Sequence, residues 1–196
     1  MKLWTKAAVP DVVRARRFEL VDAAGQVRAA LAATPDGSPA LTLWDAAGKP
    51  RASLAVDPDG TPVLGLLDAA RQPRAILDVA PDGRTGLMLL DAAGKPRAGL
   101  AVASDGSPAL MLWDAARQPR AILTVASDGR PALMFLDAAG QPQARLTVNS
   151  DGSPGLTLLD VAGKARVEFN TAEDTTRRKP FLVLFDGDGN VVWQAP

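Results

Sequence analysis

Acidic and basic residues recur at two fixed positions along this chain, and they are the side chains that could carry chemistry. The acidic series is Asp22, Asp45, Asp68, Asp91, Asp114, Asp137 and Asp160. The basic series is Arg28, Arg51, Arg74, Arg97, Arg120 and Arg166, with Gln143 in place of arginine in one copy. Carboxylates near a base or a cation are what acid–base catalysis and calcium binding require. A series repeated along the whole chain marks no single site, however, and aspartate before a turn accepts backbone N–H bonds. We therefore interpret both series as structural.

The sequence gives little support for any other catalytic, cofactor-binding or metal-binding site. The chain contains no histidine and no cysteine, which removes the commonest general base and all thiolate ligands. No nucleophile is paired with a base, and no glycine-rich phosphate loop precedes a helix. The run Asp186-Gly187-Asp188-Gly189-Asn190 matches the start of a calcium loop, but the glutamate that ends such loops is missing. We predict a tight turn there, no catalytic, cofactor-binding or metal-binding residue, no cofactor, and a protein that is not an enzyme.

A few large side chains could instead form a surface for a partner. Aromatic residues and methionine on a solvent-facing surface can mark such a site. The candidates are Trp44, Trp113, Met88, Met111 and Met134. Copies of the repeat with leucine at the tryptophan position are equally apolar, so a second packed layer would explain them as well.

All these residues lie in a unit of 23 residues that recurs without insertion. Its copies begin at Phe18, Leu41, Leu64, Leu87, Leu110, Leu133 and Leu156. In the copy at 41–63, two alternating runs, LTLWD and RASLAV, are separated by the turn signals AAGK and PDG. Short alternating runs bounded by Gly, Pro and Asp indicate strands joined by hairpin turns. A fixed period of this size is typical of repeat architectures, in which units stack on their neighbours.

The odd period constrains the pairing register, because side chains alternate faces every two residues. Equivalent residues share a face only if one loop has three residues and the other four. With 46–49 as the four-residue loop, Asp45 opposes Pro50, Leu43 opposes Ala52, and Leu41 opposes Leu54. The face that we call the leucine face then carries Leu41, Leu43, Ala52, Leu54, Val56, Leu64 and Leu66. The opposite, mixed face carries Thr42, Trp44, Arg51, Ser53, Ala55 and Leu67.

The leucine face needs a cover, because burying an exposed leucine is worth about 1.5–3 kcal/mol. We expect a second layer, a spiral of the sheet, or another copy of the chain to hide it.

Two turns differ in sequence from the others, since Arg71 and Arg117 replace the usual turn glycine. A left-handed arginine costs about 1 kcal/mol, so we expect these two turns to differ in shape.

The predicted fold is all-β: tandem 23-residue hairpin repeats in an antiparallel meander, as a flattened two-layer or a spiralling sheet. The alternative is a parallel β-solenoid, in which the aspartates would stack about 4.8 Å apart and repel one another. We divide the chain into an N-terminal lead-in (1–17), seven repeats (18–170), a polar excursion (171–180) and a C-terminal capping hairpin (181–196).

The repeat resembles one known family in its turn. Asp45, Gly48 and Arg51 lie in a unit that is similar to the YD repeats of bacterial RHS-type proteins. Those repeats also place an Asp-x-x-Gly-Arg turn between short strands of a spiralling sheet. The tyrosine that names them is absent here. The resemblance implies shared turn chemistry and no function.

The charge and hydropathy of the chain limit the range of possible functions. The 22 basic and 22 acidic residues cancel, so no basic surface for nucleic acid or anionic membranes is expected. No apolar run is long enough for a spanning helix, and no secretory signal is evident at the start. We expect a cytoplasmic protein, with export by another route or a removed leader left open, and a bacterial source from the composition.

We hypothesise a non-catalytic structural protein, a β-repeat scaffold that associates with itself or with a larger complex. The alternative hypothesis is a module that binds a glycan or small ligand between repeats through Trp44 and Trp113.

Overall fold

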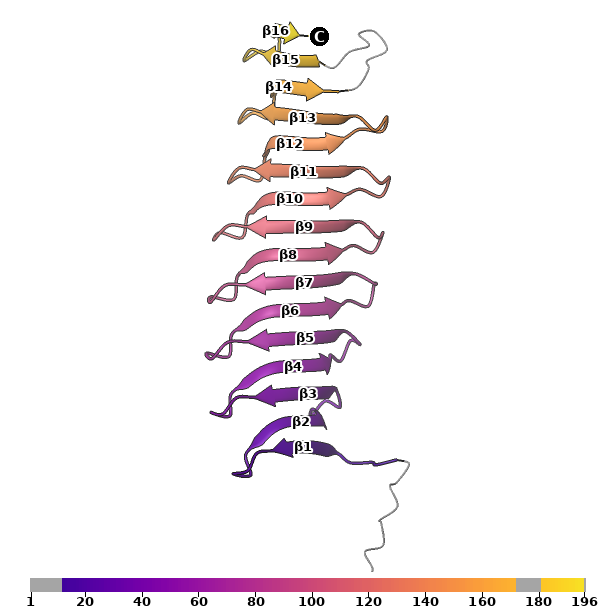
Figure 1. Cartoon of the computed structure of the whole chain (residues 1–196), viewed down its shortest axis with the longest axis vertical. Coiled ribbons are helices and arrows are strands. Elements are labelled where there is room, and N and C mark those ends of the chain that lie inside the picture. The colour runs from indigo at the N-terminus through magenta and orange to yellow at the C-terminus, as the bar shows by residue number, and fades with distance from the viewer. Residues whose placement is uncertain (1–11, 172–180, 196) are drawn as a thin grey trace, which may run out of the picture.

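The computed structural model describes residues 12–171 and 181–195, which form strands and turns only. Each strand pairs antiparallel with the strand before and after it, in the order β1 to β16 (Figure 1). The antiparallel meander is therefore confirmed, and the parallel solenoid is excluded. The strands are β1 Arg17–Val21, β2 Val27–Ala33, β3 Pro39–Trp44, β4 Pro50–Val56, β5 Pro62–Leu67, β6 Pro73–Val79, β7 Thr85–Leu90, β8 Pro96–Val102, β9 Pro108–Trp113, β10 Pro119–Val125, β11 Pro131–Leu136, β12 Pro142–Val148, β13 Pro154–Leu159, β14 Ala165–Asn170, β15 Phe181–Phe185 and β16 Val191–Ala195.

The sheet is a single open layer. Among the described residues each strand contacts only its neighbours in sequence, so β16 does not return to β1 and no strand lies over another. The two-layer alternative therefore does not occur within one chain. The strand axes stay nearly parallel to one another along the whole stack, while the chain direction alternates from strand to strand (Figure 1). Most strands begin with proline, which lacks an N–H group and is tolerated at the first residue of a strand.

The turn after each odd-numbered strand differs from the predicted one. Between β3 and β4, the Asp45 N–H donates to the Lys49 carbonyl at 2.9 Å and the Gly48 N–H to the Asp45 carbonyl at 3.0 Å, which closes a three-residue loop. Trp44 then opposes Pro50 while Leu43 opposes Ala52, so Arg51 is the extra residue of a β-bulge. The predicted four-residue loop, with Asp45 opposite Pro50, is wrong. The bulge restores the face alternation that we assigned to a longer loop.

The turn after each even-numbered strand from β2 to β12 is the predicted three-residue loop. At Pro58–Gly60 the Asp57 N–H donates to the Thr61 carbonyl at 2.8 Å. Leu54 opposes Leu64 and Ala52 opposes Leu66, as the parity argument requires. The faces predicted for the strands are therefore correct.

The two arginine turns keep the shape of the glycine turns. Arg71 and Arg117 both have φ 65°, close to the 69° of Gly48. The Arg71 N–H donates to the Asp68 carbonyl at 3.0 Å, as the glycine N–H does elsewhere. The expectation of a different shape is wrong. The hydrogen bonds of the hairpin fix the loop, and the arginines adopt its left-handed position at a cost of about 1–2 kcal/mol.

The ends of the array are partly described. Residues 1–11 of the lead-in and 172–180 of the polar excursion lie outside the described residues, and the division of the chain into segments stays a prediction. β15 and β16 form a hairpin whose turn is closed by the Asp186 N–H donating to the Asn190 carbonyl at 2.9 Å. The run of Asp and Gly residues is thus the tight turn that we predicted. In 12–171 and 181–195 there is no helix that could cross a membrane.

Candidate functional site: an exposed leucine face

The strand register places one large apolar residue of each strand opposite the next, in a continuous line that we call the central row. Leu41 opposes Leu54, Leu54 opposes Leu64, and the pattern continues from β1 to β15. The members of the central row are Phe18, Leu31, Leu41, Leu54, Leu64, Leu77, Leu87, Leu100, Leu110, Leu123, Leu133, Leu146, Leu156, Phe169 and Leu182.

A second line on the same face, the alternating row, switches between small and large residues. It runs through Ala29, Leu43, Ala52, Leu66, Ala75, Leu89, Ala98, Leu112, Ala121, Phe135, Ala144 and Leu158. Valine and proline flank the central row on its other side, as at Val102 opposite Pro108. From β2 to β13 these three lines contain no charged residue and one polar residue, Thr85.

The leucine face is exposed along its length. Leu31 is 49% exposed, Leu54 51% and Leu100 52%. No large side chain in the described part of the chain is fully buried. The array alone therefore does not cover its own apolar face. Neither a second layer of the same chain nor a spiral of the sheet, two of the three covers that we expected, hides the leucines.

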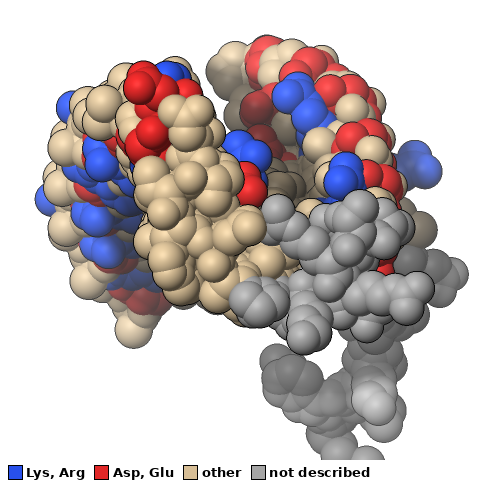
Figure 2. All heavy atoms as spheres, turned by 90° about the horizontal axis from the view of Figure 1, so that it is seen from above, with Lys and Arg blue, Asp and Glu red and all other residues tan. Residues whose placement is uncertain are grey.

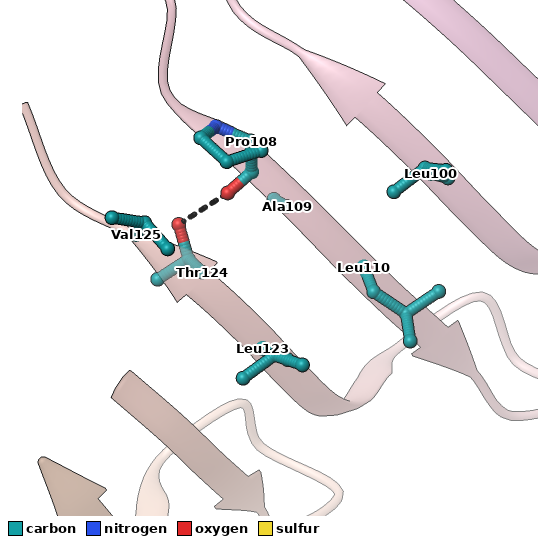
Figure 3. A pocket seen from close by; sticks show the side chains of 7 residues that line it. All are labelled: Leu100, Pro108, Ala109, Leu110, Leu123, Thr124 and Val125. Carbon is teal, nitrogen blue, oxygen red and sulfur yellow. Dashed lines mark hydrogen bonds between the residues drawn. The ribbon is translucent and has the colours of Figure 1, made fainter. Parts of the chain in front are cut away.

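Shallow apolar hollows lie on this face. One of ≈ 160 Å³ is bounded by Leu100, Leu110 and Leu123 on β8, β9 and β10, with Pro108 and Val125 on its other side (Figure 3). A hollow of ≈ 130 Å³ repeats two strands along, beside Leu123, Leu133 and Leu146. The two hollows lie at equivalent positions of neighbouring repeats, two strands apart.

The mixed face is held together by hydrogen bonds at the turns. The Asp45 carboxylate accepts the N–H of Ala47 at 2.9 Å and that of Lys49 at 3.0 Å. Arg51 lies 3.5 Å from this carboxylate and donates from Nε to the Leu67 carbonyl of the next hairpin at 3.1 Å. The Lys49 N–H, then the Ala47 N–H and Arg51, hold the pKa of Asp45 below its ordinary value, against the opposite effect of desolvation.

These contacts join successive hairpins and repeat along the array. The Arg74 Nε donates to the Leu90 carbonyl at 2.9 Å, and the Lys49 Nζ to the carbonyl of Ala69 at 2.9 Å. Where glutamine replaces arginine, the Gln143 amide still donates to Asp137 at 3.1 Å. The Asp and Arg series therefore have the structural role that we predicted for them.

The five predicted partner residues are spread over the mixed face. Met88 and Met111 both oppose Gly99, and Met134 opposes Ile122, the neighbour of Met111 in the same line. Trp113 lies close to this line, whereas Trp44 is on β3, six strands away. The structure therefore groups the methionines with Trp113 and leaves Trp44 apart. A partner surface at these side chains stays a prediction.

Trp113 packs against the neighbouring strand β8 of the same chain. A Cβ atom added at Gly99, which is buried, would lie 2.7 Å from Trp113 Cη2. At the corresponding position of the copy with Trp44, 14 residues before it, Ala30 is likewise small and is 4% exposed. Of the four copies with leucine at the tryptophan position, two carry isoleucine there, Ile76 and Ile122, whereas the copy with Leu67 carries Ser53. In the copy with Trp113, the missing side chain at Gly99 thus leaves room for the indole ring.

Many of the charged side chains lie at the turns that end the strands. Viewed down the long axis, they lie on two lobes with a hollow between them, and uncharged surface joins the lobes (Figure 2). The described residues include no group of three or more acidic side chains placed to hold a metal ion.

Comparisons with known proteins give a resemblance of fold. No protein-family model and no curated protein matches the chain. Among solved structures it is similar to the SAS-4 (dCPAP) TCP domain in complex with a Proline Rich Motif of Ana2 (dSTIL) of Drosophila melanogaster, with 12% identity, TM-score 0.46, and 98% of this chain and 97% of that chain covered.

It is also similar to the wild-type TCP10 domain of Danio rerio CPAP, with 18% identity, TM-score 0.34, and 90% and 93% covered. The same domain in complex with a peptide of Danio rerio STIL gives 13% identity, TM-score 0.23, and 91% and 98% covered. At these TM-scores the likeness carries no argument about what this chain binds.

Sequence reasoning located the leucine face but missed that it is the exposed one. It assigned the partner surface to rare residue types, tryptophan and methionine. The signal for the exposed leucine face is the register itself, because it already placed Leu41, Leu54 and Leu64 in one line.

Proposed function

We propose that this protein is a non-catalytic structural module that assembles with a protein partner, a second copy or a subunit of a larger complex, through its leucine face. The observation that carries the proposal is the exposed central row, which crosses fifteen strands from Phe18 to Leu182. The proposal depends on this chain's own surface and not on the peptides in the TCP-domain structures.

The size of the face sets it apart from ordinary surface. Sixteen strands about 4.8 Å apart and about six residues wide give an area of roughly 1,500 Å². The largest apolar patch of a typical monomer is about 300–600 Å², and a stable interface takes about 800 Å² from each partner. The leucine face therefore exceeds what a monomer usually exposes and suffices for a stable complex.

The mixed face carries a shorter apolar patch than the leucine face. Its charged residues are joined to one another and to backbone carbonyls of the next hairpin. Its line of central residues is polar or lacks a side chain at Thr42, Ser53 and Gly65. From β2 to β13 its large apolar residues are confined to β6–β11 and are Ile76, Met88, Met111, Ile122 and Met134. Association through the leucine face thus removes the largest unfavourable exposure.

A matched pair of variants on β7 tests the proposal. Leu87 and Met88 are adjacent, point to opposite faces, and are 38% and 39% exposed. In affinity capture from the source cells, we expect Leu87→Glu to abolish the association of the chain with other proteins or with a differently tagged copy. Met88→Glu is expected to leave it intact. Equal capture by both variants and by the native chain contradicts the proposal.

A further inference from the structure

We infer that the partner on the leucine face is a second copy of this chain, packed face to face as a two-layer β-sandwich. This inference rests on the proposed function and adds the identity and geometry of the occupant. Two sheets that pack face to face lie about 10 Å apart, with the side chains of their inner faces interdigitated.

The small twist of the sheet is compatible with a second sheet as its partner. Neighbouring strands usually rotate by about 20–25°, so a sheet of many strands normally becomes a propeller. Here the strand axes stay nearly parallel from β1 to β16 (Figure 1). Sheets of many strands with little twist are typically stabilised by stacking on another sheet or by side-chain ladders, and both would act here if the leucine face met a second sheet.

The periodicity of the face favours a copy of the same chain. The hollow beside Leu100, Leu110 and Leu123 recurs beside Leu123, Leu133 and Leu146, so its spacing is two strands, about 9.6 Å. A partner that fills both hollows must present apolar side chains at that spacing. The alternating row, with a leucine or phenylalanine on every second strand from Leu43 to Leu158, has this spacing.

A two-fold axis makes such an interface self-complementary, since both copies contribute the same patch. The alternating row offers both elements of interdigitation: large side chains such as Leu112 protrude, and Ala98 and Ala121 leave space on either side. Charge does not oppose the contact. The net charge is zero, and the face itself carries no charged residue from β2 to β13. The area of each face is about twice what a stable dimer needs.

The test is the mass of the purified full-length chain by size-exclusion chromatography with light scattering, over a range of concentrations. We expect twice the chain mass of 20.4 kDa for the native protein. Leu87→Glu is expected to weaken the dimer at least about 100-fold, because each dimer loses two buried leucines. Met88→Glu is expected to change the dissociation constant by less than about threefold. Leu87→Gln, an uncharged variant, guards against misfolding, and circular dichroism must show the native β spectrum for all three.

Each result decides between the proposals. A native dimer that Leu87→Glu and Leu87→Gln dissociate and Met88→Glu does not supports the inference. A native monomer at every concentration overturns it; if capture from cells still requires Leu87, the proposed function stands with a different protein as the occupant. A native oligomer that all three variants preserve overturns the face-to-face arrangement. Failure of both the mass and the capture experiment overturns the proposed function as well.

Discussion

Two adjacent residues of β2 show how differently the two faces of this sheet are built. Ala30, on the mixed face, is 4% exposed, whereas Leu31, on the leucine face, is 49% exposed. The larger apolar side chain is the one that stays in solvent. The contrast teaches that the mixed face is completed by contacts within the chain, and that the leucine face is left for contacts outside it.

The chemistry of the two faces follows the same division. On the mixed face, side chains differ from copy to copy, and in one copy Gly99 leaves room for Trp113. On the leucine face, the central row repeats the same residue type on nearly every strand. Variation with compensation is what packing within a chain produces, whereas strict repetition suits a partner with the same repeat.

The largest expected effect on stability comes from breaking the compensation on the mixed face. Gly99→Ile gives this copy the residue of its neighbours Ile76 and Ile122, but its side chain would collide with Trp113. Overpacking of this kind costs about 1–3 kcal/mol. We expect urea unfolding to show that loss and Trp113→Leu, in the same chain, to restore most of it. The oligomeric mass should not change.

A double-mutant cycle makes this prediction specific. Trp113→Leu alone is the control, because leucine is the residue at this position in the flanking copies, Leu90 and Leu136. If Gly99→Ile and Trp113→Leu have additive effects, the two positions are not coupled and the compensation is not real. If Gly99→Ile instead changes the oligomeric mass, the division of roles between the faces is wrong.

The sequence sufficed for the strands, their faces and most of the register. Period, turn residues and parity together place Leu41 opposite Leu54 and Ala52 opposite Leu66, and the structure agrees. It did not suffice for the bulge at Arg51, because a longer loop and a bulge restore face alternation equally well. It also did not reveal the open single layer. Whether an apolar face is covered depends on contacts between repeats that are far apart in the sequence. When all repeats have nearly the same sequence, the sequence does not indicate which of them are in contact.

Acid is expected to weaken the turns without acting on the leucine face directly. The pKa of Asp45 is lowered chiefly by the Lys49 N–H, that of Asp68 by the Gln72 N–H, and that of Asp91 by the Lys95 N–H. A carboxyl whose pKa is lower in the folded than in the unfolded state stabilises the fold above the unfolded value of about 3.9. That contribution is lost as the pH falls through the folded value.

The urea midpoint should therefore be level from about pH 7 to pH 5 and fall below about pH 4. The control is Asp45→Asn, which keeps an acceptor for the Lys49 and Ala47 N–H groups but does not titrate. It should reduce the slope of the acid branch. A midpoint that rises on acidification would contradict the assigned role of these carboxylates.

The smallest expected effect lies at the turns, which serve both faces equally. Arg71→Gly relieves a left-handed arginine, worth about 1–2 kcal/mol, but adds about 0.5–1 kcal/mol of unfolded-state entropy. A net gain of about 0.5–1 kcal/mol in the free energy of unfolding should follow. Gly48→Arg is the reciprocal variant, and since a Cβ there meets nothing within 4 Å, its loss should be of similar size. Equal stability of both variants and the native chain would show that the turn imposes no strain.

The central claim, that the leucine face is covered by a second copy, is tested most directly by small-angle X-ray scattering of the native chain. The account predicts a particle of twice the chain mass that is no longer than one sheet, about 75 Å for sixteen strands, with a thicker cross-section. A particle of single-chain mass, or one of double mass that is close to twice as long, would contradict it.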